Sequence, residues 1–195
     1  ELDAETAGGK VPMTTASFAA RLAAAGQVVE RSKDASVLAT YWRIVGSAEW
    51  FADRFSSSVA AVDRALALAE SVGNDREARK IMIHKSIGTV SGPDPVPKAR
   101  AELEAMLASA ASIQMRVELL TDLGILVAAS GAADEGRAHV AEALRLLEEF
   151  GLLGRISENR RMSAWIERLV GDYDAEIAFF DLAVEALQIA PPLAA

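Results

Sequence analysis

Few residues of this 195-residue chain are of the types that carry out chemistry, and their spacing does not bring them together. His84 and His139 are the only histidines, and there is no cysteine. Zinc sites draw mainly on these two residue types, at short spacing or with carboxylate help. The two histidines fall in different predicted helices. We therefore expect packing or surface roles for them, and neither a metal site nor a bound cofactor.

Side-chain clusters that could be mistaken for catalytic groups have structural explanations. Glu148-Glu149 ends a predicted helix, and Asp172 and Asp174 belong to a turn and a helix cap. Two carboxylates act as acid and base only when they share a pocket that separates their pKa values. Ser56-Ser57-Ser58 begins a helix, and no Gly-Lys-Ser/Thr phosphate loop is present. We predict no catalytic residues and no enzymatic activity.

The overall composition limits the classes of partner. The net charge of −8 argues against binding of nucleic acid by this region, and no apolar stretch is long enough to span a membrane. The absence of cysteine is compatible with a reducing compartment, so we expect a cytoplasmic location.

Apolar residues recur at helical spacing along almost the whole chain, and the prolines are confined to three short clusters. The sequence therefore predicts a single all-α domain over residues 15–190, with a flexible N-terminal tail at 1–14 and a C-terminal tail at 191–195. We expect nine helices, over residues 15–31, 35–52, 55–72, 75–90, 97–110, 114–129, 133–149, 156–170 and 173–189.

Local signals mark the joints between these helices. Asp34 and Asn74 precede helical runs as N-caps do, and Gly73 and Gly151 stand where a left-handed residue ends a helix. The links are short, which makes neighbouring helices antiparallel. Each helical hairpin is too small to bury its own apolar face, so we expect the hairpins to stack.

A weak repeat supports this stack of hairpins. The motif Trp42-Arg43-Ile44-Val45-Gly46 returns as Leu120-Thr121-Asp122-Leu123-Gly124, and the small residues Gly46, Gly88, Gly124 and Ala164 recur every 36 to 42 residues. We expect the small residues to let two helices of a hairpin approach closely. Large residues should fill the gaps between hairpins, as we predict for Trp42, Leu120 and Phe180. The repeat gives about four hairpins after a leading helix.

Three segments resemble the tetratricopeptide-repeat regions of large, mostly actinobacterial signalling proteins, namely Ala65–Glu70, Glu142–Glu148 and Gly171–Asp174. In those proteins a nucleotide cyclase or DNA-binding domain and an ATPase module precede the repeats. The resemblance implies a right-handed superhelical stack, an α-solenoid whose first helices line a concave face.

The same resemblance implies a binding surface, because ligands of this family contact fixed positions of the first helices. Carried over to this sequence, the predicted binding residues are Arg43, Ser47, Trp50, Lys85, Thr89, Thr121, Ile125, Arg161, Trp165 and Arg168. Their basic and aromatic side chains favour an acidic peptide or carboxylate ligand. The alternative is that the tryptophans pack between hairpins and the basic residues pair with neighbouring acids.

Two functions remain open from the sequence. The first is a regulatory interaction module of a larger signalling or transcription-regulating protein, which binds a protein segment or another domain of its own chain on the concave face. The second is a small-molecule sensor that controls an attached ATPase, cyclase or DNA-binding domain. A closed apolar pocket favours the sensor, and an open or basic groove favours the protein partner.

Overall fold

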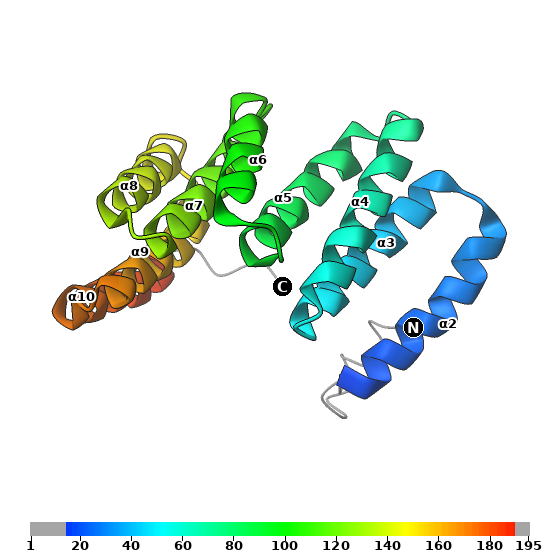
Figure 1. The fold of residues 1–195 in the computed structure, drawn as a ribbon, viewed down its shortest axis with the longest axis horizontal. Helices are drawn as coiled ribbons and strands as arrows, with labels where there is room; N and C mark the ends of the chain where they lie inside the picture. Colours follow the sequence, from blue (N-terminus) through cyan, green and yellow to red (C-terminus); the bar gives the residue numbers. More distant parts are fainter. Residues whose placement is uncertain (1–14, 190–195) are drawn as a thin grey trace.

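A computed structural model describes residues 15–189, so the predicted tails at 1–14 and 191–195 lie outside the described residues. Between Thr15 and Ile189 the chain forms helices joined by short links and contains no strand (Figure 1). The elements are α2 (Thr15–Ser32), α3 (Ala35–Phe51), α4 (Phe55–Ser71), α5 (Asp75–Ser91), α6 (Val96–Ala108), α7 (Ile113–Ala129), α8 (Ala133–Glu149), the 3₁₀ turn η1 (Leu153–Arg155), α9 (Ile156–Val170) and α10 (Tyr173–Ile189).

The nine predicted helices are confirmed, with ends that agree to within two residues. The caps follow the sequence signals. The carboxylate of Asp34 accepts a hydrogen bond from the Ser36 amide (2.9 Å), and the side chain of Asn74 accepts one from the Glu77 amide (3.1 Å). Gly73 ends α4 with φ at +63°, in the left-handed region that glycine reaches without steric cost. The 3₁₀ turn η1 was not among the predicted elements.

Successive helices pack side by side, but not all pairs are equally close. The pairs α3–α4, α7–α8 and α9–α10 are tightly packed hairpins, whereas α5 contacts α6 only sparsely. Instead α5 packs on α4 and α7, and α6 packs on α7. This loose pairing coincides with two features of α6: a Pro-containing link precedes it, and the helix is short.

Small residues set the closeness of the tight hairpins. A Cβ atom on Gly136 would lie 2.6 Å from the Gly124 carbonyl oxygen, so the backbones of α7 and α8 touch at this point. In α3–α4 the buried Ser58 hydroxyl donates a hydrogen bond to the Gly46 carbonyl (2.8 Å). The predicted close approach is thus confirmed at Gly46 and Gly124. At Gly88 a Cβ would meet only the Val59 side chain, at 3.4 Å.

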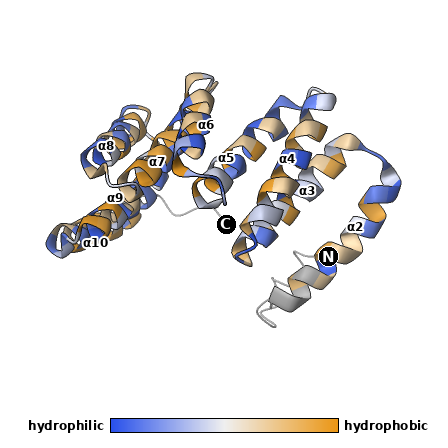
Figure 2. Ribbon diagram, viewed as in Figure 1, coloured by the Kyte–Doolittle hydropathy of each residue, from blue (hydrophilic) through white to orange (hydrophobic). Residues whose placement is uncertain are grey.

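Helix α7 is the centre of the core. Eleven of its residues are buried, and much of its ribbon has the colour of hydrophobic residues (Figure 2). Leu119 and Leu123 pack in one cluster with α6, and Leu120 packs in another with Leu147 of α8. The predicted gap-filling role of Leu120 agrees with this second cluster, because Ile156 of α9 in the next hairpin also packs against it. No helix within residues 15–189 has the length and hydropathy of a membrane span.

The predicted packing role of Phe180 is wrong. Its side chain is 40% exposed, because α10 contacts only α9 and η1 among the described elements. It belongs to an exposed apolar side of α10 that also includes Tyr173, Ile177, Val184 and Leu187. Trp42, in contrast, packs against a buried cluster formed by α3, α4 and α5.

Candidate functional site

The first helices of the hairpins, α3, α5, α7 and α9, surround a cavity of about 320 Å³, which we call the first-helix cavity. It brings together five of the ten predicted binding residues: Trp50 from α3, Thr121 and Ile125 from α7, and Arg161 and Trp165 from α9. These helices lie far apart in sequence and converge on one side of the stack. The cavity is therefore the place where the predicted surface is most complete.

Both predicted tryptophans border this cavity. The Trp50 ring packs edge-on against Phe51, with ring centroids 5.1 Å apart, and its indole nitrogen is buried without a hydrogen-bond partner within the described residues. Trp165 is 39% exposed. The exposed part of the Trp165 ring is available for contact with a ligand, whereas the Trp50 indole N–H is buried and unpartnered.

A smaller hollow of about 130 Å³ adjoins the first-helix cavity and shares Trp50 and Ile87 with it. Ser47, another predicted binding residue, lines this hollow, and its hydroxyl donates to the Arg43 carbonyl (3.2 Å). The two hollows together run from α3 across α5 and α7 to α9.

Two predicted residues face elsewhere. Lys85 and Thr89 line a separate hollow of about 480 Å³ formed by α4, α5 and α6. The Lys85 ammonium lies 2.9 Å from Asp63 of α4 and 3.2 Å from Glu102 of α6. Burial alone would lower the pKa of Lys85, but these two carboxylates outweigh it and raise the pKa. The loose α5–α6 pairing leaves this side of α5 open.

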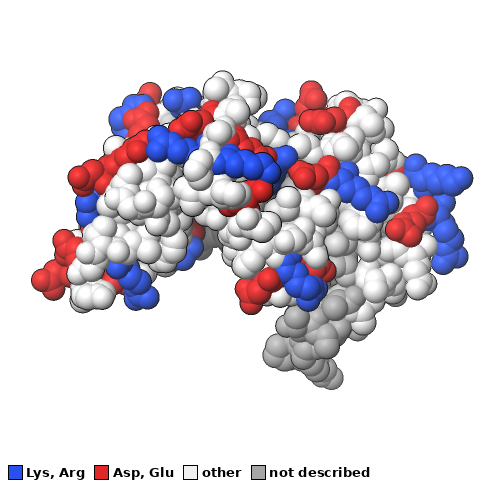
Figure 3. All heavy atoms as spheres, viewed as in Figure 1, with Lys and Arg blue, Asp and Glu red and all other residues white. Residues whose placement is uncertain are grey.

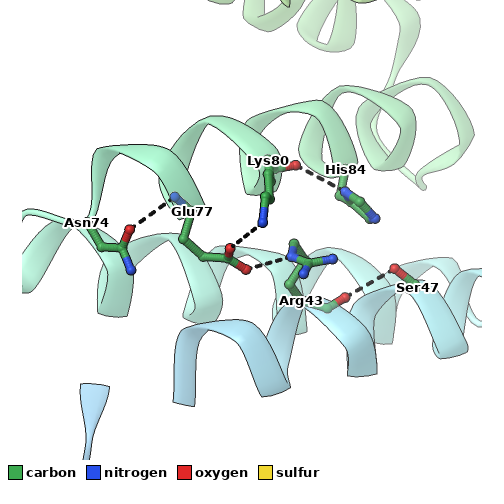
Figure 4. A network of polar contacts seen from close by, with 6 residues as sticks. All are labelled: Arg43, Ser47, Asn74, Glu77, Lys80 and His84. Carbon is green, nitrogen blue, oxygen red and sulfur yellow. Dashed lines mark hydrogen bonds and ion pairs between the residues drawn. The ribbon is translucent and has the colours of Figure 1, made fainter. Parts of the chain in front are cut away.

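Arg43 is held in a polar network between α3 and α5 (Figure 4). Its Nε lies 2.7 Å from the carboxylate of Glu77, which also contacts Lys80 at 3.3 Å. Burial would raise the pKa of Glu77, but the hydrogen bonds from Arg43 and Lys80 outweigh it, so the pKa is lowered. Nearby, burial lowers the pKa of His84, whose Nδ1 lies 3.0 Å from the Lys80 carbonyl.

The four basic residues of the predicted surface are each paired with an acid. Besides Arg43 and Lys85, Arg161 contacts Glu158 of α9, and Arg168 contacts Glu176 of α10 at 2.7 Å. Arg168 does not line the first-helix cavity. In the view of Figure 3, acidic and basic side chains are mixed along the surface. These four side chains therefore do not provide an unpaired basic surface for an anionic partner.

The cavity also contains an acid that was not among the predicted residues. Asp122 lines it, and the carboxylate oxygen Oδ2 is buried with no hydrogen-bond partner in the described part of the chain. Burial raises the pKa of Asp122 to about 7, and the nearby Ser86 hydroxyl offsets part of this rise. A sequence signal was available, because Asp122 is the only charged residue in the apolar stretch from Leu119 to Ala129.

Asn159 is a further polar group in the cavity that the sequence did not reveal. Its side-chain amide donates to the Val140 carbonyl at 3.2 Å, while its Oδ1 is buried without a partner in the described structure. With Trp50 and Asp122, three side chains that line this cavity carry a buried polar atom with neither a hydrogen bond nor an ion pair, while Glu118 Oε1, also buried without a hydrogen bond, lies against Arg155. Such atoms are uncommon in folded proteins and cost free energy unless water or a ligand satisfies them.

The groups considered for catalysis serve structural roles or lie apart. Asp172 accepts a hydrogen bond from the Ala175 amide (3.0 Å) at the start of α10, and Glu149 pairs with Arg145 at 2.6 Å. His84 lies in α5 and His139 in α8, and residues 15–189 contain no group of three or more side chains placed to hold a metal ion. Comparison of the chain with models of known families, with curated proteins and with solved structures finds no match.

Proposed function

We propose that this chain is a non-catalytic recognition module, a tetratricopeptide-like helical domain that binds a segment of a protein partner in the first-helix cavity. The observation that carries the proposal is that two tryptophans line this one cavity together with Asp122 and Asn159, and that Trp50, Asp122 and Asn159 each carry a buried polar atom with neither a hydrogen bond nor an ion pair. Tryptophan is enriched among the residues that dominate binding energy. Buried polar atoms without partners gain most when a ligand supplies the missing hydrogen bonds.

The extent of the hollow supports a protein segment as the occupant. The cavity continues into the smaller hollow beside Ser47, so the available surface crosses four helices. An extended segment can place successive side chains along such a path. By the resemblance to repeat regions of bacterial signalling proteins, the partner is a protein or a further domain of the same chain, in a cytoplasmic regulatory system.

A small-molecule effector is the second candidate, and the size of the cavity favours it. A volume of about 320 Å³ lies at the lower end of the range of small-ligand pockets, roughly 300–1,000 Å³. The lining also has the composition of such pockets, in which a few polar groups are set among apolar side chains. The sensor function therefore rests on the same cavity and differs only in the occupant.

The test is a selection of displayed peptides against the whole chain, followed by affinity measurements on variants. We expect Trp165→Ala to lower the affinity for the selected peptides at least tenfold, because the substitution removes an aromatic anchor from the cavity lining. Tyr173→Ala on α10 is the matched control, since Tyr173 is an exposed aromatic residue away from the cavity and should leave affinity unchanged. Peptides that bind the Trp165 variant as tightly as the native chain would contradict the proposal.

A further inference from the structure

The ionisable side chains of the first-helix cavity are paired with one exception. Glu118 is paired with Arg155 of η1, and Glu158 is paired with Arg161 on α9. The fifth ionisable residue in the lining, Asp122, has no cationic partner among the described residues. A charged Asp122 would therefore be a buried anion without a counterion.

The elements around Asp122 do not supply the missing positive charge. From α5 the cavity is lined by Ile87, Val90 and Ser91, and α3 contributes Trp50. The other charged groups of the cavity are Glu118 on the same helix, Arg155 on η1, and Glu158 and Arg161 on α9, whose two arginines are already paired. A ligand can supply the counterion and the missing hydrogen bond together.

We propose that the first-helix cavity receives a primary ammonium group on an alkyl chain, with Asp122 as its counterion. This inference rests on the proposed function and names the chemistry of its ligand. An ammonium group carries three donors, and Asp122 Oδ2 and Asn159 Oδ1 are buried, unpartnered oxygen atoms of two side chains that line this cavity. The apolar lining from Ile87, Ile125 and Met162 suits the alkyl chain, and the tryptophan rings attract a cation.

An ammonium fits this site better than a guanidinium. A guanidinium is recognised best by two carboxylate oxygens at once, in a bidentate arrangement. At Asp122 a single oxygen, Oδ2, is buried and unpartnered. An ammonium group is a compact point charge and needs only this one oxygen contact. The same ammonium chemistry is offered by a lysine side chain of a protein and by a free alkylamine.

The inference is tested by NMR titration of the whole chain at pH 8 with n-pentylammonium, and with 1-pentanol as a neutral ligand of similar shape. We expect n-pentylammonium to bind at least tenfold more tightly than 1-pentanol and to shift the Trp50 indole signal. Asp122→Asn should reduce the ammonium affinity at least tenfold. Asp181→Asn, which removes an exposed carboxylate on α10, should leave it unchanged.

The pH dependence of the native chain gives a second measurement that needs no variant. Because the ammonium remains charged, its affinity should fall severalfold from pH 8 to pH 6 as Asp122 takes up a proton. Equal affinity for 1-pentanol, an unchanged affinity of the Asp122 variant, or an affinity that does not vary with pH would each overturn the inference.

A blocked tripeptide with a central lysine distinguishes the two sources of the ammonium. If the tripeptide binds more tightly than n-pentylammonium, the ligand is a lysine side chain; if it binds more weakly, the ligand is a free amine. Both results support the ammonium site. Failure of the ammonium tests while peptide binding still depends on Trp165 would remove this inference and leave the proposed function standing.

Discussion

At the scale of single residues, Asp122 differs most from an ordinary carboxylate of a helical protein. It lies in the most buried helix of the stack, and its surroundings raise its pKa to about 7. The folded chain therefore holds this proton more tightly than the unfolded chain, in which the pKa is near 3.8. The free-energy penalty of ionising Asp122 is absent below about pH 4, grows between pH 4 and 7, and is complete above pH 7.

The raised pKa of Asp122 corresponds to a free-energy penalty of roughly 4 kcal/mol for the ionised side chain. We therefore predict that Asp122→Asn stabilises the fold at pH 8 by more than about 1 kcal/mol. At pH 4.5 most of the gain should vanish, because Asp122 is protonated there in the folded chain. Urea denaturation at the two pH values measures the effect, with Asp181→Asn as the control for lost surface charge. A gain of equal size at both pH values would contradict the pKa assignment.

Sequence spacing could predict part of the site at this scale. Five of the residues predicted from their positions in the first helices line one cavity, namely Trp50, Thr121, Ile125, Arg161 and Trp165. Spacing within a helix could not predict which side of α5 is covered by other helices, because that depends on how α6 packs. Lys85 therefore meets Asp63 and Glu102 in a different hollow. Ion pairs between helices, such as Arg43 with Glu77, likewise depend on tertiary contacts that a single helix pattern does not contain.

At the scale of helices, the spacing of small residues decides how closely a hairpin can pack. Gly124 and Gly136 place two backbones in contact, whereas Gly88 occupies the corresponding position of a loosely paired helix. In the sequence repeat, Gly88 and Gly124 occupy equivalent positions. The repeat could not reveal that the second hairpin is loose, since the partner of Gly88 is set by the path of the chain through the Pro-containing link.

We therefore expect Gly136→Ala to destabilise the fold by about 1–3 kcal/mol, because the added methyl group would meet the Gly124 carbonyl at 2.6 Å. Gly88→Ala is the matched control. Its methyl group meets only a side chain at 3.4 Å, and alanine favours a helix by up to about 1 kcal/mol, so this variant should be neutral or more stable. Thermal denaturation compares the two, and equal losses in both variants would refute the backbone contact.

At the scale of the whole molecule, the order of helices explains why a site forms at all. Each short link returns the chain to the same side of the stack, so α3, α5, α7 and α9 contribute to one cavity although they span more than a hundred residues. The helix number and order followed from apolar periodicity, because nearly every helix buries one side against a neighbour. The cavity could not be predicted from apolar periodicity, since its depth depends on the spacing and angles between four helices.

The central claim is that ligands bind in the first-helix cavity, and the indole signals of the three tryptophans test it most directly. Trp50 and Trp165 border the cavity, while Trp42 packs in a separate cluster beneath the Arg64 guanidinium, 4.0 Å from its ring centre. On titration of the labelled chain with a selected peptide, we predict shifts of the Trp50 and Trp165 indole signals and an unchanged Trp42 signal. Binding that leaves both cavity indoles unchanged and instead shifts amides on α6 or α10 would contradict the account.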